Sequence, residues 1–275
     1  MIQDIGEHTF DNQYHPCPPD RESYALYYED HAALVRKYPD RIEFPKFRDI
    51  ERLNEDIYED AVYLFSIDGE RYYLVEEINR ERQSHFTMEN TEIFRYAEPQ
   101  YLAFAGITGY QLHNWYQSRR FCGKCGRRMK KDSKERMLYC EFCHNMEFPK
   151  ICPAVIIGVT DGDKILMSKY AGRTYKKYAL LAGFTEIGET LEETVQREVM
   201  EEVGLKVKNI RYYKSQPWAL SGSLLAGFYC DLVGDDKIKL QEDELSVAEW
   251  VKAEDINEEA DDISLTKEMM LKFKT

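Results

Sequence analysis

Three glutamates stand close together in the C-terminal half of the chain, at Glu198, Glu201 and Glu202. On an α-helix, residues three and four positions apart share one face, so this spacing predicts a single exposed acidic face. Three carboxylates on one turn repel one another unless a cation lies among them. Carboxylates also suit hard divalent ions such as Mg²⁺, which bind substrate phosphates at the same time. The spacing therefore favours a metal site for phosphate chemistry, and the alternative is a solvated acidic helix.

The surrounding residues predict the helix that would carry these carboxylates. Thr190 and Glu193 form a T-x-x-E capping box, which indicates a helix start near Leu191. Apolar residues recur every fourth position and can face a core: Leu191, Val195 and Val199. Gly204 stands where helices commonly end in the left-handed conformation.

The glutamates belong to a longer pattern, G-x5-E-x7-R-E-U-x-E-E-x-G-U, in which U is apolar. Its fixed positions are filled by Gly183, Glu189, Arg197, Glu198, Val199, Glu201, Glu202, Gly204 and Leu205. This is the Nudix box, so the chain resembles the Nudix hydrolases, which cleave a phosphoanhydride in a nucleoside diphosphate linked to another group. The resemblance implies a C-terminal α/β/α sandwich with a mixed sheet. We expect Arg197 to pair with box carboxylates such as Glu189.

Four of the seven cysteines form two C-x2-C pairs, Cys122/Cys125 and Cys140/Cys143, with fourteen residues between the pairs. This pattern predicts a structural Zn²⁺ held by four thiolates in a zinc ribbon. The alternative is two disulfides or redox-active pairs. The N-terminus has neither a basic start nor an apolar run, so we expect a cytoplasmic, non-membrane protein, in which disulfides are rare.

A second motif narrows the resemblance. Residues Ser215–Ser223 resemble SQPWPxPxS, the signature of the NADH pyrophosphatase subfamily, although Ala219 and Ser221 replace its two later prolines. The upstream zinc ribbon fits the same subfamily. The resemblance implies hydrolysis of NAD(H) to AMP and nicotinamide mononucleotide, and a homodimer.

The resemblance also implies a metal site for Mg²⁺ or Mn²⁺. Its ligands would be Glu198, Glu201, Glu202, the backbone carbonyl of Ala182, and Glu244 about forty residues after the box. Glu202 or Glu201 would orient or deprotonate the attacking water.

The nucleotide pocket would be lined by the signature segment and by two aromatic walls. The signature residues are Gln216, Pro217, Trp218, Ala219, Leu220, Ser221, Gly222 and Ser223. The walls would be Phe148 and Phe184, because aromatic rings stack on bases. For Phe148 and Trp218, packing in a core is the alternative.

The ribbon region is basic in a chain whose net charge is −13. Between residues 117 and 136 there are nine Lys or Arg and two acids. This segment could follow an RNA backbone, which makes RNA with a 5′ NAD cap a candidate substrate, or it could be a solvated face that offsets the acidic body. A noncatalytic zinc-ribbon module, binding RNA or protein beside a vestigial Nudix domain, is a further alternative.

The 275 residues suggest an α+β protein with three segments. We predict an α+β N-terminal domain over 1–115, the ribbon over 116–148 and the Nudix domain over 149–275. Strands at 61–67 and 71–78 flank Asp68-Gly69, a hairpin signal. We also predict a helix over 101–119, strands at 210–214 and 223–232, and a final helix over 265–273.

Overall fold

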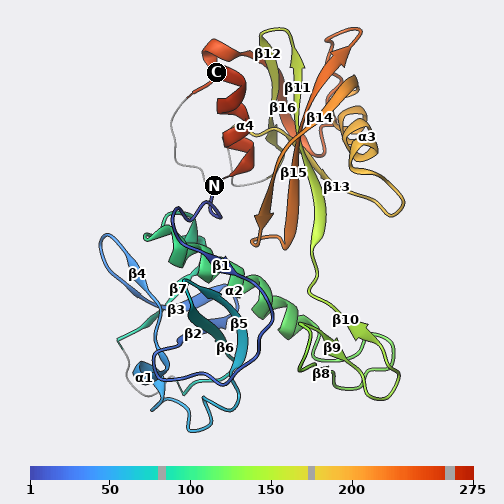
Figure 1. Ribbon diagram of the computed structural model, residues 1–275. Helices are drawn as coiled ribbons and strands as arrows, with labels where there is room; N and C mark the ends of the chain where they lie inside the picture. The colour runs from blue at the N-terminus through green and yellow to red at the C-terminus, as the bar shows by residue number, and fades with distance from the viewer. Residues whose placement is uncertain (80–84, 173–176, 258–263) are drawn as a thin grey trace. The chain divides into compact units, whose positions relative to one another are not determined.

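The computed structural model describes residues 1–79, 85–172, 177–257 and 264–275. Its chain divides into two compact units, Ile2–Lys150 and Ile151–Thr275, with Met1 grouped with the second (Figure 1). The first unit contains both the N-terminal segment and the ribbon. Their separation near residue 115 stays a prediction.

A seven-stranded sheet forms the main part of the first unit. Its strands are β1 (Phe10–Asp11), β2 (Tyr24–Glu29), β3 (Ala32–Lys37), β4 (Ile42–Glu43), β5 (Val62–Ile67), β6 (Glu70–Val75) and β7 (Thr87–Asn90). The order is β1-β5-β6-β2-β3-β4, and β7 pairs with β3. The β5–β6 hairpin turns at Asp68 and Gly69, whose φ angles of 53° and 81° are those that a tight hairpin turn requires. This turn was predicted from the sequence, whereas β2, β3, β4 and β7 were not.

The first unit also contains a short helix α1 (Phe47–Ile50), a 3₁₀ segment (Thr91–Arg95) and the long helix α2 (Gln100–Ser118), close to its predicted range. Two glycines of α2 lie against other elements. A Cβ at Gly106 would lie 2.5 Å from the Phe94 ring, and one at Gly109 would lie 2.5 Å from Leu26. Small residues at these positions let α2 pack closely.

The ribbon is a three-stranded sheet of β8 (Lys130–Lys131), β9 (Leu138–Tyr139) and β10 (Met146–Glu147), ordered β10-β9-β8. Arg136 attaches it to the N-terminal sheet. Its guanidinium donates to Asn12 Oδ1 at 2.9 Å and to the backbone carbonyls of Asn12 and Leu64. Burial lowers the pKa of Arg136, but a guanidinium titrates so high that it stays charged. Its bonds to carbonyls compensate for this burial.

The second unit is built on a six-stranded mixed sheet. Its elements are β11 (Cys152–Asp161), β12 (Lys164–Tyr170), β13 (Leu181–Phe184), α3 (Leu191–Val203), β14 (Lys206–Trp218), β15 (Ser223–Val233), β16 (Leu245–Lys252), a 3₁₀ turn (Ala253–Asp255) and α4 (Leu265–Lys274). The strand order is β14-β15-β11-β12-β16, with β13 paired to β11. Strands β11 and β15 are parallel, and the other pairs are antiparallel.

Helices α3 and α4 lie on opposite faces of this sheet (Figure 1). Residues of β11 alternate between the two faces, because successive strand side chains point to opposite sides. Val155 and Ile157 pack in the cluster that contains Val199 of α3, whereas Ile156 packs with Met269 of α4. The predicted α/β/α sandwich is confirmed. Within the described residues, no helix is both long and apolar enough to cross a lipid bilayer.

Candidate active site and zinc site

Helix α3 begins and ends where the sequence predicts. The Thr190 side chain accepts from the Glu193 N–H, and the Glu193 carboxylate accepts from the Thr190 N–H at 2.8 Å, which completes the capping box. Gly204 ends the helix with φ 68°. The apolar stripe is buried at Val195 and Val199, so the position and rotation of α3 are fixed by local signals and by the core.

Arg197 is the centre of the charge network on α3. Its guanidinium contacts Glu189 at 2.6 Å, Glu198 at 2.7 Å and Glu201 at 2.9 Å. It also donates to the backbone carbonyl of Phe184 at 2.9 Å. Hydrogen bonds from Arg197 lower the pKa of Glu189 to about 2. Arg197 thus links Glu189 before α3 to Glu198 and Glu201 on the helix, and its pairing with Glu189 agrees with the sequence prediction.

The three glutamates differ in exposure, which corrects the expected exposed face. Glu198 is 8% and Glu202 is 2% exposed, whereas Glu201 is exposed. Gly183 makes room for Glu198, because a Cβ there would lie 1.9 Å from the Glu198 carboxylate carbon. Burial raises the pKa of Glu198; Arg197 opposes this shift, while the charges of Glu201 and Glu244 add to it.

A turn before β16 brings Glu244 to the same site. The Gln241 N–H donates to the Glu202 carbonyl at 2.9 Å, and the Lys239 N–H donates to the Val203 carbonyl at 2.9 Å. The Gln241 side chain then donates to Glu244 Oε1 at 3.3 Å. Gln241 therefore connects the end of α3 to Glu244. No motif in the sequence indicates this role for Gln241.

The oxygen atoms of these glutamates are suitable ligands for a hard divalent cation. Burial and the negative charges of Glu201 and Glu244 raise the pKa of Glu198, and a cation among these carboxylates would offset that charge. Ala182, the implied carbonyl ligand, lies on β13 beside Gly183. In the described part of the chain, the four cysteines are the one set of three or more His, Cys, Asp or Glu residues whose possible metal-ligand atoms all lie within 4.8 Å of one another. Three of the box carboxylates, those of Glu189, Glu198 and Glu201, contact the Arg197 guanidinium instead.

Two residues expected to bind substrate, Phe184 and Gln216, lie in one row of paired residues across neighbouring strands. Phe184 pairs with Ala154, Ala154 with Leu225, and Leu225 with Gln216. Phe184 is 55% exposed, as a stacking wall requires. Gly183 lies against the Glu198 carboxylate of α3, and Phe184 is the next residue of β13. One strand therefore contributes both to the surroundings of Glu198 and to this row of paired residues. Phe148 is 53% exposed and belongs to the first unit.

The first part of the signature segment belongs to a β-strand. Gln216, Pro217 and Trp218 are the last residues of β14, which is longer than the predicted strand at 210–214. Gln216 is fully buried, and its Oε1 accepts from the Leu265 N–H at the start of α4 at 2.7 Å.

The remaining signature residues form the turn between β14 and β15. Ala219 and Leu220 are half-buried, Ser221 is exposed, and Gly222 has φ 66°. Ser221 and Ser223 hydroxyls are 2.8 Å apart.

The four cysteines form two equivalent knuckles. In the first, the Gly126 N–H donates to the Cys122 carbonyl at 2.8 Å; in the second, the His144 N–H donates to the Cys140 carbonyl at 2.9 Å. Gly126 and His144 both have positive φ, 74° and 57°. The matching hydrogen bonds give both pairs the same conformation.

The sulfur positions fit zinc. All four Sγ atoms lie within 4.8 Å of one another, and Cys122–Cys143 and Cys125–Cys140 are 3.5 Å apart. A tetrahedral site with Zn–S of about 2.3 Å separates its sulfurs by about 3.8 Å, whereas a disulfide needs about 2.05 Å. The backbone N–H of Cys143 lowers the pKa of the Cys140 thiol to about 6, whereas burial and hydrogen bonds with the other cysteines raise that of Cys125 to about 12; a bound cation would favour the thiolate at every position.

The C-terminal part of the chain matches one family of known proteins. A model of the NUDIX domain matches residues 150–272. The chain is 42% identical over 144 residues to the NAD-capped RNA hydrolase NudC of Pectobacterium atrosepticum, covering 52% of this chain and 55% of that protein. It is 36% identical over 186 residues to the protein of the same name from Pasteurella multocida, covering 67% of this chain and 69% of that protein.

The chain thus spans about half the length of the first of these relatives. Among solved structures, a NUDIX hydrolase from Nitrosomonas europaea is 25% identical with a TM-score of 0.41, covering 50% of this chain and 80% of that one.

Proposed function

Because the chain belongs to the Nudix hydrolase superfamily, and within it to the NADH pyrophosphatase subfamily, we propose that it hydrolyses the pyrophosphate of NAD(H). The products are AMP and nicotinamide mononucleotide. We extend the proposal to RNA, from whose 5′ ends the same cleavage would remove an NAD cap. The observation that carries the proposal is that Glu198, Glu201 and Glu202 lie on the last turns of α3, and that Gln241 connects this end of the helix to Glu244.

Buried Glu198 and Glu202, with Glu244 and the Ala182 carbonyl, would hold Mg²⁺ or Mn²⁺. Such an ion neutralises charge on the pyrophosphate oxygens and lowers the pKa of water. Either Glu202 or the exposed Glu201 would orient or deprotonate the attacking water. Water oxygen then bonds to one phosphorus while the bridging oxygen leaves with the other phosphate.

The remaining residues bind and orient the dinucleotide. Phe184 offers an exposed ring for a flat base, worth about 1–3 kcal/mol per stacked base. Phe148 is a second candidate wall. Pro217, Trp218 and the turn to Ser223 would border the pocket, with Gln216 holding β14 against α4.

The test is a product assay with purified protein and Mg²⁺ or Mn²⁺. NADH, NAD⁺, ADP-ribose, diadenosine polyphosphates and NAD-capped RNA are compared, with AMP and nicotinamide mononucleotide as the diagnostic products. Glu202→Gln should lose about 100-fold or more in kcat, as expected for a group that acts in the transition state. Glu192→Gln, an exposed glutamate on the same helix, is the matched control.

A protein that binds NADH but releases no products with either metal would contradict the proposal. That result would support the noncatalytic zinc-ribbon module instead. We also propose a homodimer, which light scattering of the zinc-loaded protein would test.

A further inference from the structure

The cations of the ribbon divide into two groups. One group is already engaged within the first unit: Arg119 with Glu147 at 3.7 Å, Lys130 with Glu141 at 2.7 Å, Lys131 with Glu76 at 2.7 Å, and Arg136 with backbone carbonyls. The other group has no carboxylate within 4.0 Å among the described residues: Arg120, Lys124, Arg127, Arg128 and Lys134. These five cations can therefore bind an external anion.

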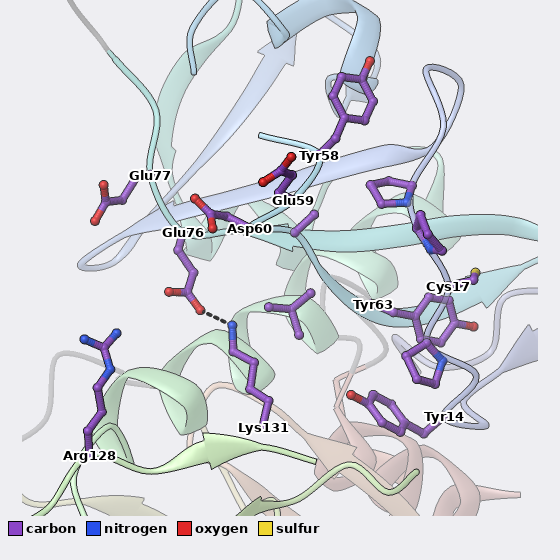
Figure 2. A pocket seen from close by; sticks show the side chains of 15 residues that line it. Tyr14, Cys17, Tyr58, Glu59, Asp60, Tyr63, Glu76, Glu77, Arg128 and Lys131 are labelled. Carbon is purple, nitrogen blue, oxygen red and sulfur yellow. Dashed lines mark hydrogen bonds and ion pairs between the residues drawn. The ribbon is translucent and has the colours of Figure 1, made fainter. Parts of the chain in front are cut away.

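Arg128 differs from the other four cations because it lines a cavity of the first unit (Figure 2). Arg128 and Lys131 border a cavity of about 860 Å³ whose N-terminal wall carries four carboxylates: Glu59, Asp60, Glu76 and Glu77. Lys131 reaches Glu76 across it (Figure 2). An acidic wall repels phosphate, so the cavity does not extend a surface for nucleic acid.

The knuckle tips present the opposite chemistry. Lys124 and Phe142 are the third residues of the two equivalent C-x2-C pairs, and both are exposed. The Arg127 guanidinium lies 3.5 Å from the centroid of the Phe142 ring, which is 59% exposed. The Arg127 guanidinium and the Phe142 ring together form a flat, positively charged surface on which a planar group can stack. Lys124 adds a second positive charge on the same pair of knuckles.

We propose that this knuckle face, formed by Lys124, Arg127 and Phe142, binds single-stranded RNA downstream of the NAD cap. Unpaired bases stack on aromatic rings and guanidinium planes, while their phosphates need cations. A chain of net charge −13 otherwise repels phosphate, which makes a local cationic and aromatic face selective. The position of the bound RNA relative to an NAD cap rests on the proposed decapping function, whereas RNA binding itself does not.

The test measures RNA binding separately from hydrolysis of the pyrophosphate. Fluorescence anisotropy with an uncapped, 5′-hydroxyl single-stranded RNA of about 20 nucleotides is applied to the full-length, zinc-loaded protein. Phe142→Ala and Arg127→Gln should each weaken binding about fivefold or more, the lower end of the loss of one stacked base. Phe142→Tyr, which keeps an aromatic ring, should bind RNA with the wild-type affinity. Lys124→Gln should reduce the slope of log K against log[salt] by about 1.

Tyr96→Ala and Lys37→Gln are matched controls, an exposed aromatic and an exposed cation of the same unit, and should bind RNA normally. All variants should retain zinc and hydrolyse free NADH at the wild-type rate. Unchanged RNA affinity in zinc-loaded Phe142→Ala would overturn the proposal, as would a wild-type protein that does not bind the RNA at low salt. A loss of dimer mass in Phe142→Ala would assign the face to a second copy of the chain instead. Failure to hydrolyse NADH would count against the proposed function but leave the RNA measurement intact.

Discussion

Gly183→Ala tests the proposed metal site without replacing any of its proposed ligands. Gly183 has no left-handed backbone requirement, so alanine meets no strain in its own φ. The added Cβ would instead lie 1.9 Å from the Glu198 carboxylate carbon and 2.0 Å from its Oε1. Ordinary contact begins near 3.4 Å, so the carboxylate must move by about 1.5 Å.

That movement sets the size of the effect. A displacement of about 1 Å in a catalytic arrangement can lower the rate about 100-fold, which corresponds to about 2.7 kcal/mol in the barrier. We therefore expect kcat for NADH to fall about 100-fold or more in Gly183→Ala, and the Mg²⁺ midpoint to rise. Overpacking of this kind should also cost about 1–3 kcal/mol in the free energy of unfolding.

The assay is NADH turnover across a titration of Mg²⁺ or Mn²⁺, with urea unfolding in parallel. Gly158→Ala is the matched control, because a Cβ there meets the Tyr229 ring at 2.8 Å in the same sheet and does not contact Glu198. Both variants should lose stability, and only Gly183→Ala should lose turnover. If Gly183→Ala kept the wild-type kcat and metal midpoint, the Glu198 carboxylate would not be a ligand in its present position.

Cys122→Ser should lower bound zinc well below one ion per chain and destabilise the first unit, because structural zinc contributes folding free energy of about 10–16 kcal/mol; metal analysis of gently purified wild type without zinc would refute the site. Glu244→Gln should shift the Mg²⁺ activation midpoint upward and slow NADH hydrolysis, whereas Glu242→Gln should titrate like wild type; the reverse order would place the ligand wrongly. Arg197 holds the pKa of Glu189 at about 2, below its unfolded value of about 4.5. The stabilisation by Glu189 is therefore fully present above about pH 4.5 and lost as the pH falls through about 2, so the urea midpoints of Glu189→Gln and wild type should differ at pH 6, and the difference should shrink steadily below about pH 4.5.

The parts of the site that local signals determine could be predicted from the sequence. The capping box at Thr190 and Glu193 and the left-handed Gly204 each involve residues a few positions apart, and the structure has both. The two cysteine knuckles are local in the same way, since each is closed by a hydrogen bond over four residues. Such features depend little on the rest of the fold, which is why spacing alone predicts them.

The exposure of the glutamates could not be predicted in this way. Spacing places Glu198 and Glu202 on one face of α3, but burial depends on what covers that face. Here the cover comes from Gly183 on β13 and from the turn at Gln241, which is 39 positions after Glu202 in the sequence. Their closeness to α3 follows from the order of strands in the sheet, and no local pattern encodes it.

Gln216 of the signature motif shows that a motif match alone does not assign the role of each residue. Gln216 was assigned to the substrate pocket with its neighbours, yet its side-chain oxygen accepts the Leu265 N–H, which lies 49 positions later. The first backbone N–H groups of a helix have no intrahelical partner, so a fully buried acceptor here stabilises the start of α4. Through this bond Gln216 fixes the end of β14, and the end of β14 places Trp218 and the turn to Ser223. A role in positioning the pocket wall therefore accounts for a glutamine at this point of the motif without requiring that it touch the dinucleotide.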